Sequence, residues 1–372
     1  MVEVQGFCDE RFRSIGDAFR ESLDTGVDKG ASIAVTVHGE SVVDLWGGAR
    51  DYELRVPWEH DTIVRVFSSS KVMTVIVVLM LVDRGLLDLD EPIATYWPGF
   101  AQHGKGAITT RQVLLHTTGL PGFGRAVTFD ELSDPDRVRQ IIEDAELWHQ
   151  PGTLTCYHAQ TFGAILGEVV ARVAGVEFEE FFQREIAGPL DADFHFGLPS
   201  EQATRVATIW PADDEYAMDT PMGAAVNAEL VTGREWIDPD RLAAVMAGAS
   251  GITNARAMAR IGTIISLRGE VEGRRYLSAD IVADAGREHA HADDLALGWC
   301  RRGLGFGIHS EDFPAPTPTT MHWGGYGGSF LTMDPVNEVT FAFAQNQLIT
   351  EGGPRGDERR LVYWRLLGEI LA

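Results

Sequence analysis

The stretch VRVFSSSKVMTVIVVLMLVDRG, residues 64–85, places three serines and one lysine at the head of an almost unbroken apolar run. Lysine occurs only at positions 29, 71 and 105, and only Lys71 is flanked by residues that favour burial. A segment that is apolar on all sides predicts a helix enclosed by protein, and Arg84-Gly85 predicts where it ends. The longest apolar run of the chain, residues 72–82, is too short to span a bilayer.

The composition of the chain indicates its size class, the partners that its charge disfavours and the compartment in which we expect it. It has 372 residues, a net charge of −24 and three cysteines. This length supports a sizeable core and predicts one large domain or two interleaved ones. The negative charge argues against nucleic acid or a membrane surface as a partner. Three cysteines without ligand spacing indicate reduced thiols, and the charged N-terminal stretch lacks the apolar segment of a signal peptide. We therefore expect a cytoplasmic protein, whose oligomeric state the sequence leaves open.

Strand patterns early and late in the chain surround a mostly helical middle. Residues 31–48 predict two strands joined by a tight turn at 38–40, whereas helical spacing dominates from 85 to 275 and includes 238–248. Alternating patterns return late, at 295–310, 327–335 and 338–347, before a closing amphipathic helix at 356–372. This order predicts an α/β (α+β) fold, with an antiparallel sheet flanked by helices and a large, mostly helical insertion. We expect a discontinuous α/β domain of residues 1–62 and 245–372, a helical domain of residues 63–244, and an active site at their junction.

Ser68 and Lys71 are spaced for joint chemistry. They are three residues apart, so on a helix their side chains share a face, and Ser68 would lie in the first turn, where free N–H groups favour negative charge. Burial lowers the pKa of a lysine, which makes it a usable base for a serine hydroxyl, whereas an arginine does not lose its proton. The alternative interpretation is that Lys71 has no catalytic role and that its long side chain extends from a core helix to the surface. Because S-x-x-K alone is a weak pattern, companion residues decide between these interpretations.

Two later segments supply such companions. Tyr157 follows a turn and precedes a helix, and its phenol can act as a base when a neighbouring ammonium stabilises the phenolate. The sequence HWGG at 322–325 begins a late strand, where glycines allow a backbone N–H to approach a substrate oxygen closely. We predict an oxyanion hole formed by the N–H groups of Ser68 and Gly325. The predicted substrate-binding residues are His322, Trp323, Gly324 and Tyr326.

With these motifs in place, the chain resembles the serine hydrolases of the class C β-lactamase and penicillin-binding-protein superfamily, and especially the family VIII carboxylesterases. SSSK at 68–71 matches S-x-x-K, YHA at 157–159 matches Y-x-N, and HWG at 322–324 matches K-T-G. Residues 114–123 and 249–262 are similar to two further segments of that family. The resemblance implies a β-lactamase/transpeptidase-like fold, Ser68 as nucleophile, Lys71 and Tyr157 as its activating pair, and Gly325 in the oxyanion hole.

Two departures from the family pattern bear on the substrate. Ala159 replaces the asparagine of Y-x-N, an amide that would hold a β-lactam side chain, and His322 replaces the lysine of K-T-G, a cation that would face a carboxylate. Both favour ester cleavage, for which Trp323 and Tyr326 would supply apolar contacts. We therefore expect a serine carboxylesterase that hydrolyses small or short-chain acyl esters through an acyl-enzyme, without metal or cofactor. Alternatives are an acyltransferase, a β-lactamase or an amide hydrolase of the same fold, and, outside enzymes, a scaffold or binding protein that retained it.

Other candidate groups receive simpler interpretations. His116 could be a catalytic base, but we favour a loop histidine that fixes a turn. The sequence EHAHADD at 288–294 clusters His289 and His291 with Asp293 and Asp294; because a metal needs convergent ligands, we favour a solvated acidic loop. Cys156 is expected to fill space in the core. The sequence lacks G-x-S-x-G, and the glycines of residues 324–329 lack the context of a dinucleotide-binding loop.

Overall fold

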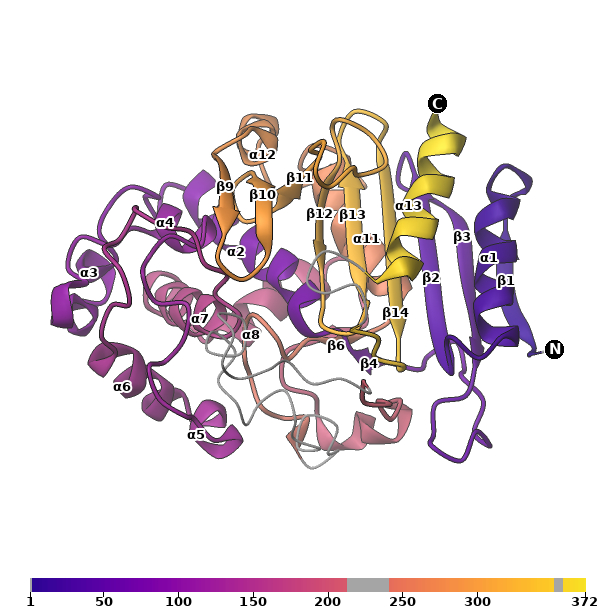
Figure 1. Ribbon diagram of the computed structural model, residues 1–372, viewed down its shortest axis with the longest axis horizontal. Helices are drawn as coiled ribbons and strands as arrows, with labels where there is room; N and C mark the ends of the chain where they lie inside the picture. Colours follow the sequence, from indigo (N-terminus) through magenta and orange to yellow (C-terminus); the bar gives the residue numbers. More distant parts are fainter. Residues whose placement is uncertain (1, 213–240, 351–356) are drawn as a thin grey trace.

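A nine-stranded antiparallel sheet forms one half of the structure, a computed structural model that describes residues 2–212, 241–350 and 357–372 (Figure 1). In spatial order its strands are β1 (Val4–Cys8), β3 (Glu40–Gly48), β2 (Gly30–Val37), β14 (Val339–Gln345), β13 (Phe330–Asp334), β12 (Met321–Gly324), β11 (Gly307–Ile308), β10 (Gly298–Arg302) and β9 (Ala290–Asp294). Two smaller sheets consist of β4 (Val64–Arg65), β6 (Ile252–Thr253) and β5 (Phe194–His195), and of β7 (Glu270–Val271) and β8 (Arg274–Arg275).

Helices cover both faces of the large sheet and fill the other half of the molecule. On one face lie α1 (Arg13–Asp24) and α13 (Glu358–Leu371), and on the other lies α11 (Ala255–Ser266) (Figure 1). The remaining α-helices with described bounds are α2 (Ser70–Asp83), α3 (Ile93–Tyr96), α4 (Thr110–Leu114), α5 (Phe129–Ser133), α6 (Pro135–Asp144), α7 (Thr161–Ala174), α8 (Phe178–Phe182) and α12 (Ala279–Gly286). Shorter helical turns are the 3₁₀ segments η1 (Glu10–Phe12), η2 (Phe67–Ser69), η3 (Pro98–Gly104) and η5 (Ser200–Arg205), and the π segment η4 (Gln183–Ala187).

Side chains on the central strands alternate between two cores. Ile33 and Val35 of β2 belong to the cluster under α1 and α13, whereas Ala34, between them, belongs to the larger cluster that contains Met258 of α11. The same larger cluster includes the buried apolar side chains of α2, so it continues from the sheet into the helical half. Successive side chains of a strand point to opposite faces of the sheet, so every second residue of each strand faces the core shared with the helices of the other half of the molecule.

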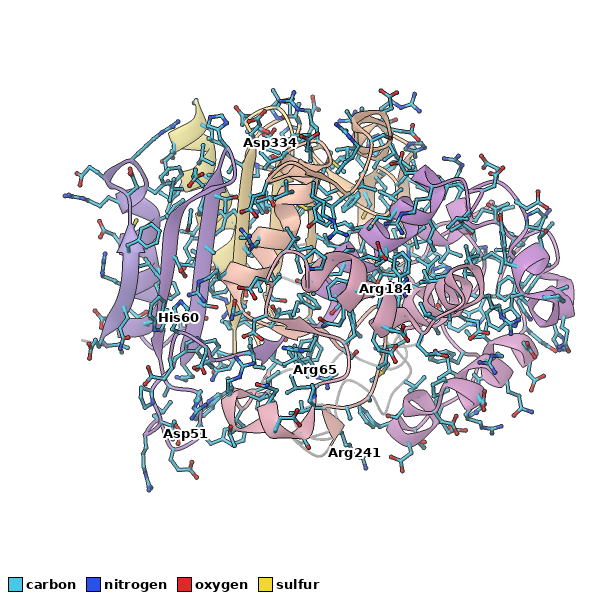
Figure 2. The ribbon with its side chains drawn as sticks, turned by 180° about the vertical axis from the view of Figure 1, so that it is seen from behind. Asp51, His60, Arg65, Arg184, Arg241 and Asp334 are labelled. Atoms are coloured by element: carbon cyan, nitrogen blue, oxygen red, sulfur yellow. The ribbon has the colours of Figure 1, made fainter. Side chains whose placement is uncertain are left out.

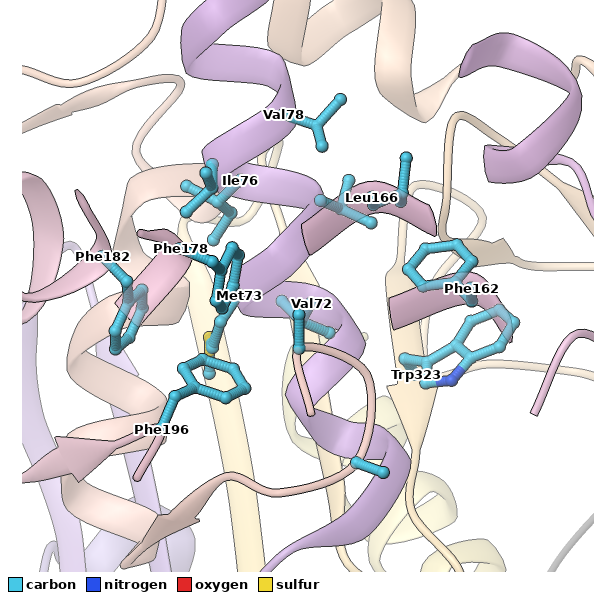
Figure 3. Packing of buried hydrophobic residues seen from close by; sticks show 14 of the residues in the cluster. Val72, Met73, Ile76, Val78, Phe162, Leu166, Phe178, Phe182, Phe196 and Trp323 are labelled. Atoms are coloured by element: carbon cyan, nitrogen blue, oxygen red, sulfur yellow. The ribbon is translucent and has the colours of Figure 1, made fainter. Parts of the chain in front are cut away.

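Helix α2 is enclosed on every side, which confirms the burial predicted for it. Each residue from Ser70 to Leu81 is buried, and Figure 3 shows its apolar side chains, including Met73 and Ile76, among phenylalanine rings of the neighbouring segments. The helix ends where predicted, with Gly85 in a left-handed conformation at φ +67°. Its start differs from the prediction, because the preceding residues form strand β4 and the 3₁₀ turn η2.

Other predicted elements have mixed outcomes. The hairpin of β2 and β3 forms as predicted, and both of its turn residues, His38 and Gly39, have positive φ, which fits the twist of a two-residue turn. The helix predicted at 238–248 is absent from its described part, residues 241–248. The carbonyl groups of Ala247 and Gly248 there accept hydrogen bonds from side chains of α2 instead. Of the predicted helical domain, residues 213–240 lie outside the described residues, and the domain boundaries stay a prediction.

Candidate active site

Ser68 lies in η2, between strand β4 and helix α2, where its side chain is half-buried. Its Oγ accepts hydrogen bonds from Lys71 Nζ at 3.1 Å and from the Tyr157 hydroxyl at 2.7 Å. The adjacent serines have other partners, because Ser69 Oγ lies 3.0 Å from Ser329 Oγ and Ser70 Oγ donates to the Phe67 carbonyl at 2.5 Å. The structure thus brings Ser68, Lys71 and Tyr157 together, and Ser68 is the serine of this turn that contacts both.

The backbone before Ser68 is strained. Phe67 has a φ of +46°, a left-handed conformation that is unusual for a residue with a bulky side chain. Such conformations persist only where surrounding contacts impose them, and they cluster at functional sites. The Phe67 ring contacts the Tyr326 ring, with centroids 5.6 Å apart. The turn that carries Ser68 is therefore held in a specific shape beside the segment that follows β12.

Lys71 is fully buried, and its nitrogen contacts two backbone carbonyls besides Ser68. Nζ donates to the carbonyl oxygen of Ala159 at 2.7 Å and to that of Gly248 at 3.0 Å. The Tyr157 ring centroid lies 5.0 Å from the nitrogen. Burial disfavours the charged form and lowers the pKa of Lys71 from its usual 10.5 to about 7. A lysine with this pKa is a base at neutral pH, as its apolar flanks predict.

His116 holds the backbone around Tyr157. Residues 154–158 have no regular secondary structure. The N–H of Cys156 donates to the carbonyl oxygen of His116 at 3.1 Å, and the N–H of His158 donates to its Nδ1 at 3.2 Å. Burial lowers the pKa of His116 well below 6.5, and its Nδ1 is the atom that accepts the His158 N–H. These contacts favour the interpretation of His116 as a histidine that fixes a turn.

Strand β12 presents Trp323, not His322, to Tyr157. The Trp323 ring lies 5.9 Å from that of Tyr157 and 5.6 Å from that of His116, and Figure 3 shows it beside Phe162 of α7. His322 points to the opposite face, where its ring lies 4.7 Å from that of Trp364 in α13. The structure therefore corrects the predicted substrate contact of His322, because successive side chains of a strand face opposite sides.

Two predicted glycines also differ from expectation. Gly324 shares the face of His322, and a Cβ added there would lie 2.7 Å from Arg360 Nη1. The N–H of Gly325 donates to the carbonyl oxygen of Ser329 at 2.7 Å, so it closes the β12–β13 ladder. It points toward β13, which corrects its predicted place in the oxyanion hole.

The predicted acidic loop at 288–294 is largely a strand, β9, and one of its carboxylates is buried. Asp294 is 2% exposed and pairs with Arg302. His289 Nε2 contacts the carbonyl oxygen of Asp284 at 2.9 Å, and His291 lies 3.9 Å from Asp312. Within residues 2–212, 241–350 and 357–372, no group of three or more His, Cys, Asp or Glu side chains could hold a metal ion.

Sequence reasoning missed three contributors to this site. The carbonyl groups of Ala159 and Gly248 act through the backbone, for which side-chain patterns carry no signal. Asp294 did have a local signal, since an aspartate often accepts N–H groups two and three residues later in a turn, as it does here from Ala296 and Leu297. Its contact with Tyr157, 137 residues away, had none.

Comparisons with known proteins agree with this arrangement. The Beta-lactamase family profile matches residues 17–363. The esterase/beta-lactamase LipL of Mycobacterium tuberculosis is 33% identical, in a match covering 93% of this chain and 84% of LipL. The crystal structure of a family VIII carboxylesterase is 32% identical with a TM-score of 0.89, over 99% of this chain and all of that one. A penicillin-binding protein homologue from Caulobacter crescentus is 28% identical with a TM-score of 0.90, over the same shares of the two chains.

These matches confirm the predicted resemblance and fold class. They cover nearly the whole chain, and the two solved structures share its arrangement of sheet and helices. No helix among the described residues is long and apolar enough to cross a membrane. The chain belongs to the Beta-lactamase family and is an enzyme, a serine hydrolase of the β-lactamase/transpeptidase-like fold.

Proposed function

We propose that this protein is a serine carboxylesterase that hydrolyses small or short-chain acyl esters through an acyl-enzyme on Ser68. The observation that carries the proposal is the placement of Ser68 Oγ within hydrogen-bond distance of both Lys71 Nζ and the Tyr157 hydroxyl. A nucleophilic serine needs a base at this distance, and the lowered pKa of Lys71 supplies one. A scaffold or binding protein would have no need for this trio.

The contacts of Lys71 suggest how the proton moves. A neutral amine has two N–H donors and one lone pair. If the two donors stay on the carbonyl groups of Ala159 and Gly248, the lone pair faces Ser68 Oγ. Lys71, with Tyr157, then takes the Ser68 proton as Oγ bonds to the ester carbonyl carbon. The pair returns this proton to the leaving alkoxide as the ester C–O bond breaks. Water resolves the acyl-enzyme by the same steps and releases the acid.

For the oxyanion hole we propose the N–H groups of Ser68 and Tyr326. Ser68 is in the first turn of η2, where N–H groups have no partner within the helix. Gly325 directs its N–H to β13, and successive N–H groups of an extended chain point to opposite sides. We infer that the N–H of Tyr326, the next residue, faces away from β13 and toward η2, which packs against β12. Two such donors would stabilise negative charge on the substrate oxygen.

Two uncharged side chains favour neutral esters as substrates. Ala159 stands where the family pattern has an amide, and Trp323 presents an aromatic ring to Tyr157. Neither is suited to hold the carboxylate of a β-lactam. A β-lactamase is the second candidate, because LipL is named as both an esterase and a β-lactamase. Cys8, Cys156 and Cys300 form no disulfide. We also propose a cytoplasmic location, where thiols stay reduced.

The proposal is tested by labelling and by a substrate panel. We expect a fluorophosphonate to form an adduct on Ser68. We also expect Ser68→Ala to abolish hydrolysis of p-nitrophenyl butyrate, while Ser69→Ala and Ser70→Ala keep most of it. An adduct on Ser69 or Ser70, or full activity in Ser68→Ala, would contradict the assignment of the nucleophile. Nitrocefin turnover as efficient as ester turnover would favour the β-lactamase candidate.

A further inference from the structure

The backbone of Tyr157 is tied to the hairpin formed by β9 and β10. The N–H of Tyr157 donates to Oδ1 of Asp294, the last residue of β9, at 3.1 Å. The same oxygen accepts the N–H groups of Ala296 and Leu297 at 2.9 and 3.0 Å, which closes the turn into β10. One carboxylate oxygen therefore holds both an edge hairpin of the large sheet and the backbone of the tyrosine that contacts Ser68.

The second oxygen of Asp294 anchors this arrangement in the core. Oδ2 accepts from Arg302 Nη2 at 2.7 Å and from Thr155 Oγ1 at 3.1 Å, and Arg302 Nη1 donates to Thr155 Oγ1 at 2.8 Å. The side chains of Asp294 and Arg302 are 0% and 2% exposed. The N–H of Leu295 also donates to the Thr155 carbonyl at 3.0 Å. Breaking such a pair would leave an uncompensated buried charge, so opening the Asp294–Arg302 contact carries a high free-energy cost.

We propose that the Asp294–Arg302 pair is a positioning device for Tyr157, which makes the β9–β10 hairpin part of the catalytic machinery. This inference rests on the proposed function, in which Tyr157 exchanges a proton with Ser68. Residues 154–158 have no regular secondary structure, so contacts from neighbouring segments set the place of the phenol. A small displacement would lengthen the 2.7 Å contact with Ser68 Oγ and slow proton transfer.

Asp334 offers a matched control, because it makes the same kind of turn elsewhere. It is 2% exposed, like Asp294, and its Oδ1 accepts the N–H groups of Val336 and Asn337 at 2.8 and 3.0 Å in the β13–β14 turn. Figure 2 shows Asp334 toward one end of the sheet and Arg65, three residues before Ser68, toward the other. Asp294→Asn and Asp334→Asn each remove a buried charge from a hairpin turn, but Asp294 is the one of the two that bonds the Tyr157 N–H.

The test compares kcat and KM for p-nitrophenyl butyrate. We expect Asp294→Asn to lower kcat by about 10- to 100-fold and to change KM by less than about threefold, while Asp334→Asn keeps the wild-type kcat. In a Tyr157→Phe background, Asp294→Asn should lower kcat little further, because both substitutions act on the same proton transfer. If Asp294→Asn does not fold, Thr155→Val, which removes only the bridging hydroxyl, should lower kcat in the same way.

Specific results would overturn the inference. One is a wild-type kcat in Asp294→Asn, provided that this variant folds. If it does not fold, a wild-type kcat in Thr155→Val would have the same meaning. Another is an equal kcat loss from Asp294→Asn with and without Tyr157→Phe. Failure of the proposed function would look different, because Tyr157→Phe itself would then keep the wild-type kcat or Ser68 would carry no acyl adduct.

Discussion

The nitrogen of Lys71 lies 2.7 Å from the main-chain carbonyl oxygen of Ala159, two residues after Tyr157. Because this contact uses the backbone, it does not depend on which side chain stands at position 159. The alanine there removes the amide of the family pattern but leaves Lys71 its partner. Lys71 and Tyr157 are thus joined through one short segment as well as through Ser68.

Lys71→Arg should be as inactive as Lys71→Ala. Arginine keeps a positive charge but does not lose its proton at any accessible pH, so it cannot act as the base for Ser68. Steady-state kinetics with p-nitrophenyl butyrate and circular dichroism of both variants would check this. Substantial activity in the arginine variant would mean that Lys71 serves only as an electrostatic partner of Tyr157.

Lys71→Met should change how stability depends on pH. Burial lowers the pKa of Lys71 from 10.5 to about 7, so between these values the unfolded wild type binds a proton that the folded protein lacks. Wild-type stability should therefore rise with pH in this window, by up to about 1.4 kcal/mol per pH unit relative to the methionine variant.

Urea unfolding of both proteins at pH 7, 8 and 9 would measure this difference. Lys71→Met also leaves the carbonyl groups of Ala159 and Gly248 without their donor, but that cost does not vary with pH. A constant gap between the two proteins across this range would contradict the lowered pKa.

The pH profile of kcat/KM should fall on the acidic side through about pH 7. Lys71 becomes protonated there and can no longer accept the Ser68 proton. His322 should contribute nothing to this limb, since burial on the opposite face of β12 lowers its pKa well below 6.5. His322→Asn should therefore keep the wild-type profile, and loss of the acidic limb in that variant would assign the limb to His322.

His116→Asn should keep most of the activity, whereas His116→Phe should lose activity and about 1–3 kcal/mol of stability. Asparagine tolerates the φ of +60° at this position and offers an oxygen to the His158 N–H, while phenylalanine leaves that buried N–H unpaired. Thermal unfolding and ester kinetics on both variants would measure these effects. An inactive but folded His116→Asn would instead support His116 as a catalytic base.

The sequence predicts those parts of the site that depend on local spacing. Ser68 and Lys71 are three residues apart, and the apolar flanks of Lys71 indicate its burial. Local spacing does not predict which residues of β12 face Tyr157, because both faces of that strand are buried. An error of one residue in the alternation then exchanges His322 for Trp323. Contacts between distant segments, such as that of Asp294 with Tyr157, are set by tertiary packing and leave no periodic trace.

The enclosure of α2 also affects how the protein loses function on heating. Amide hydrogens of a helix that is buried on every side exchange with solvent only when the whole molecule opens. Ser68 lies in the turn that leads into this helix, so we expect the nucleophile to stay in place as long as α2 is folded. Inactivation by heat should therefore coincide with global unfolding, and partially frayed molecules should still be acylated.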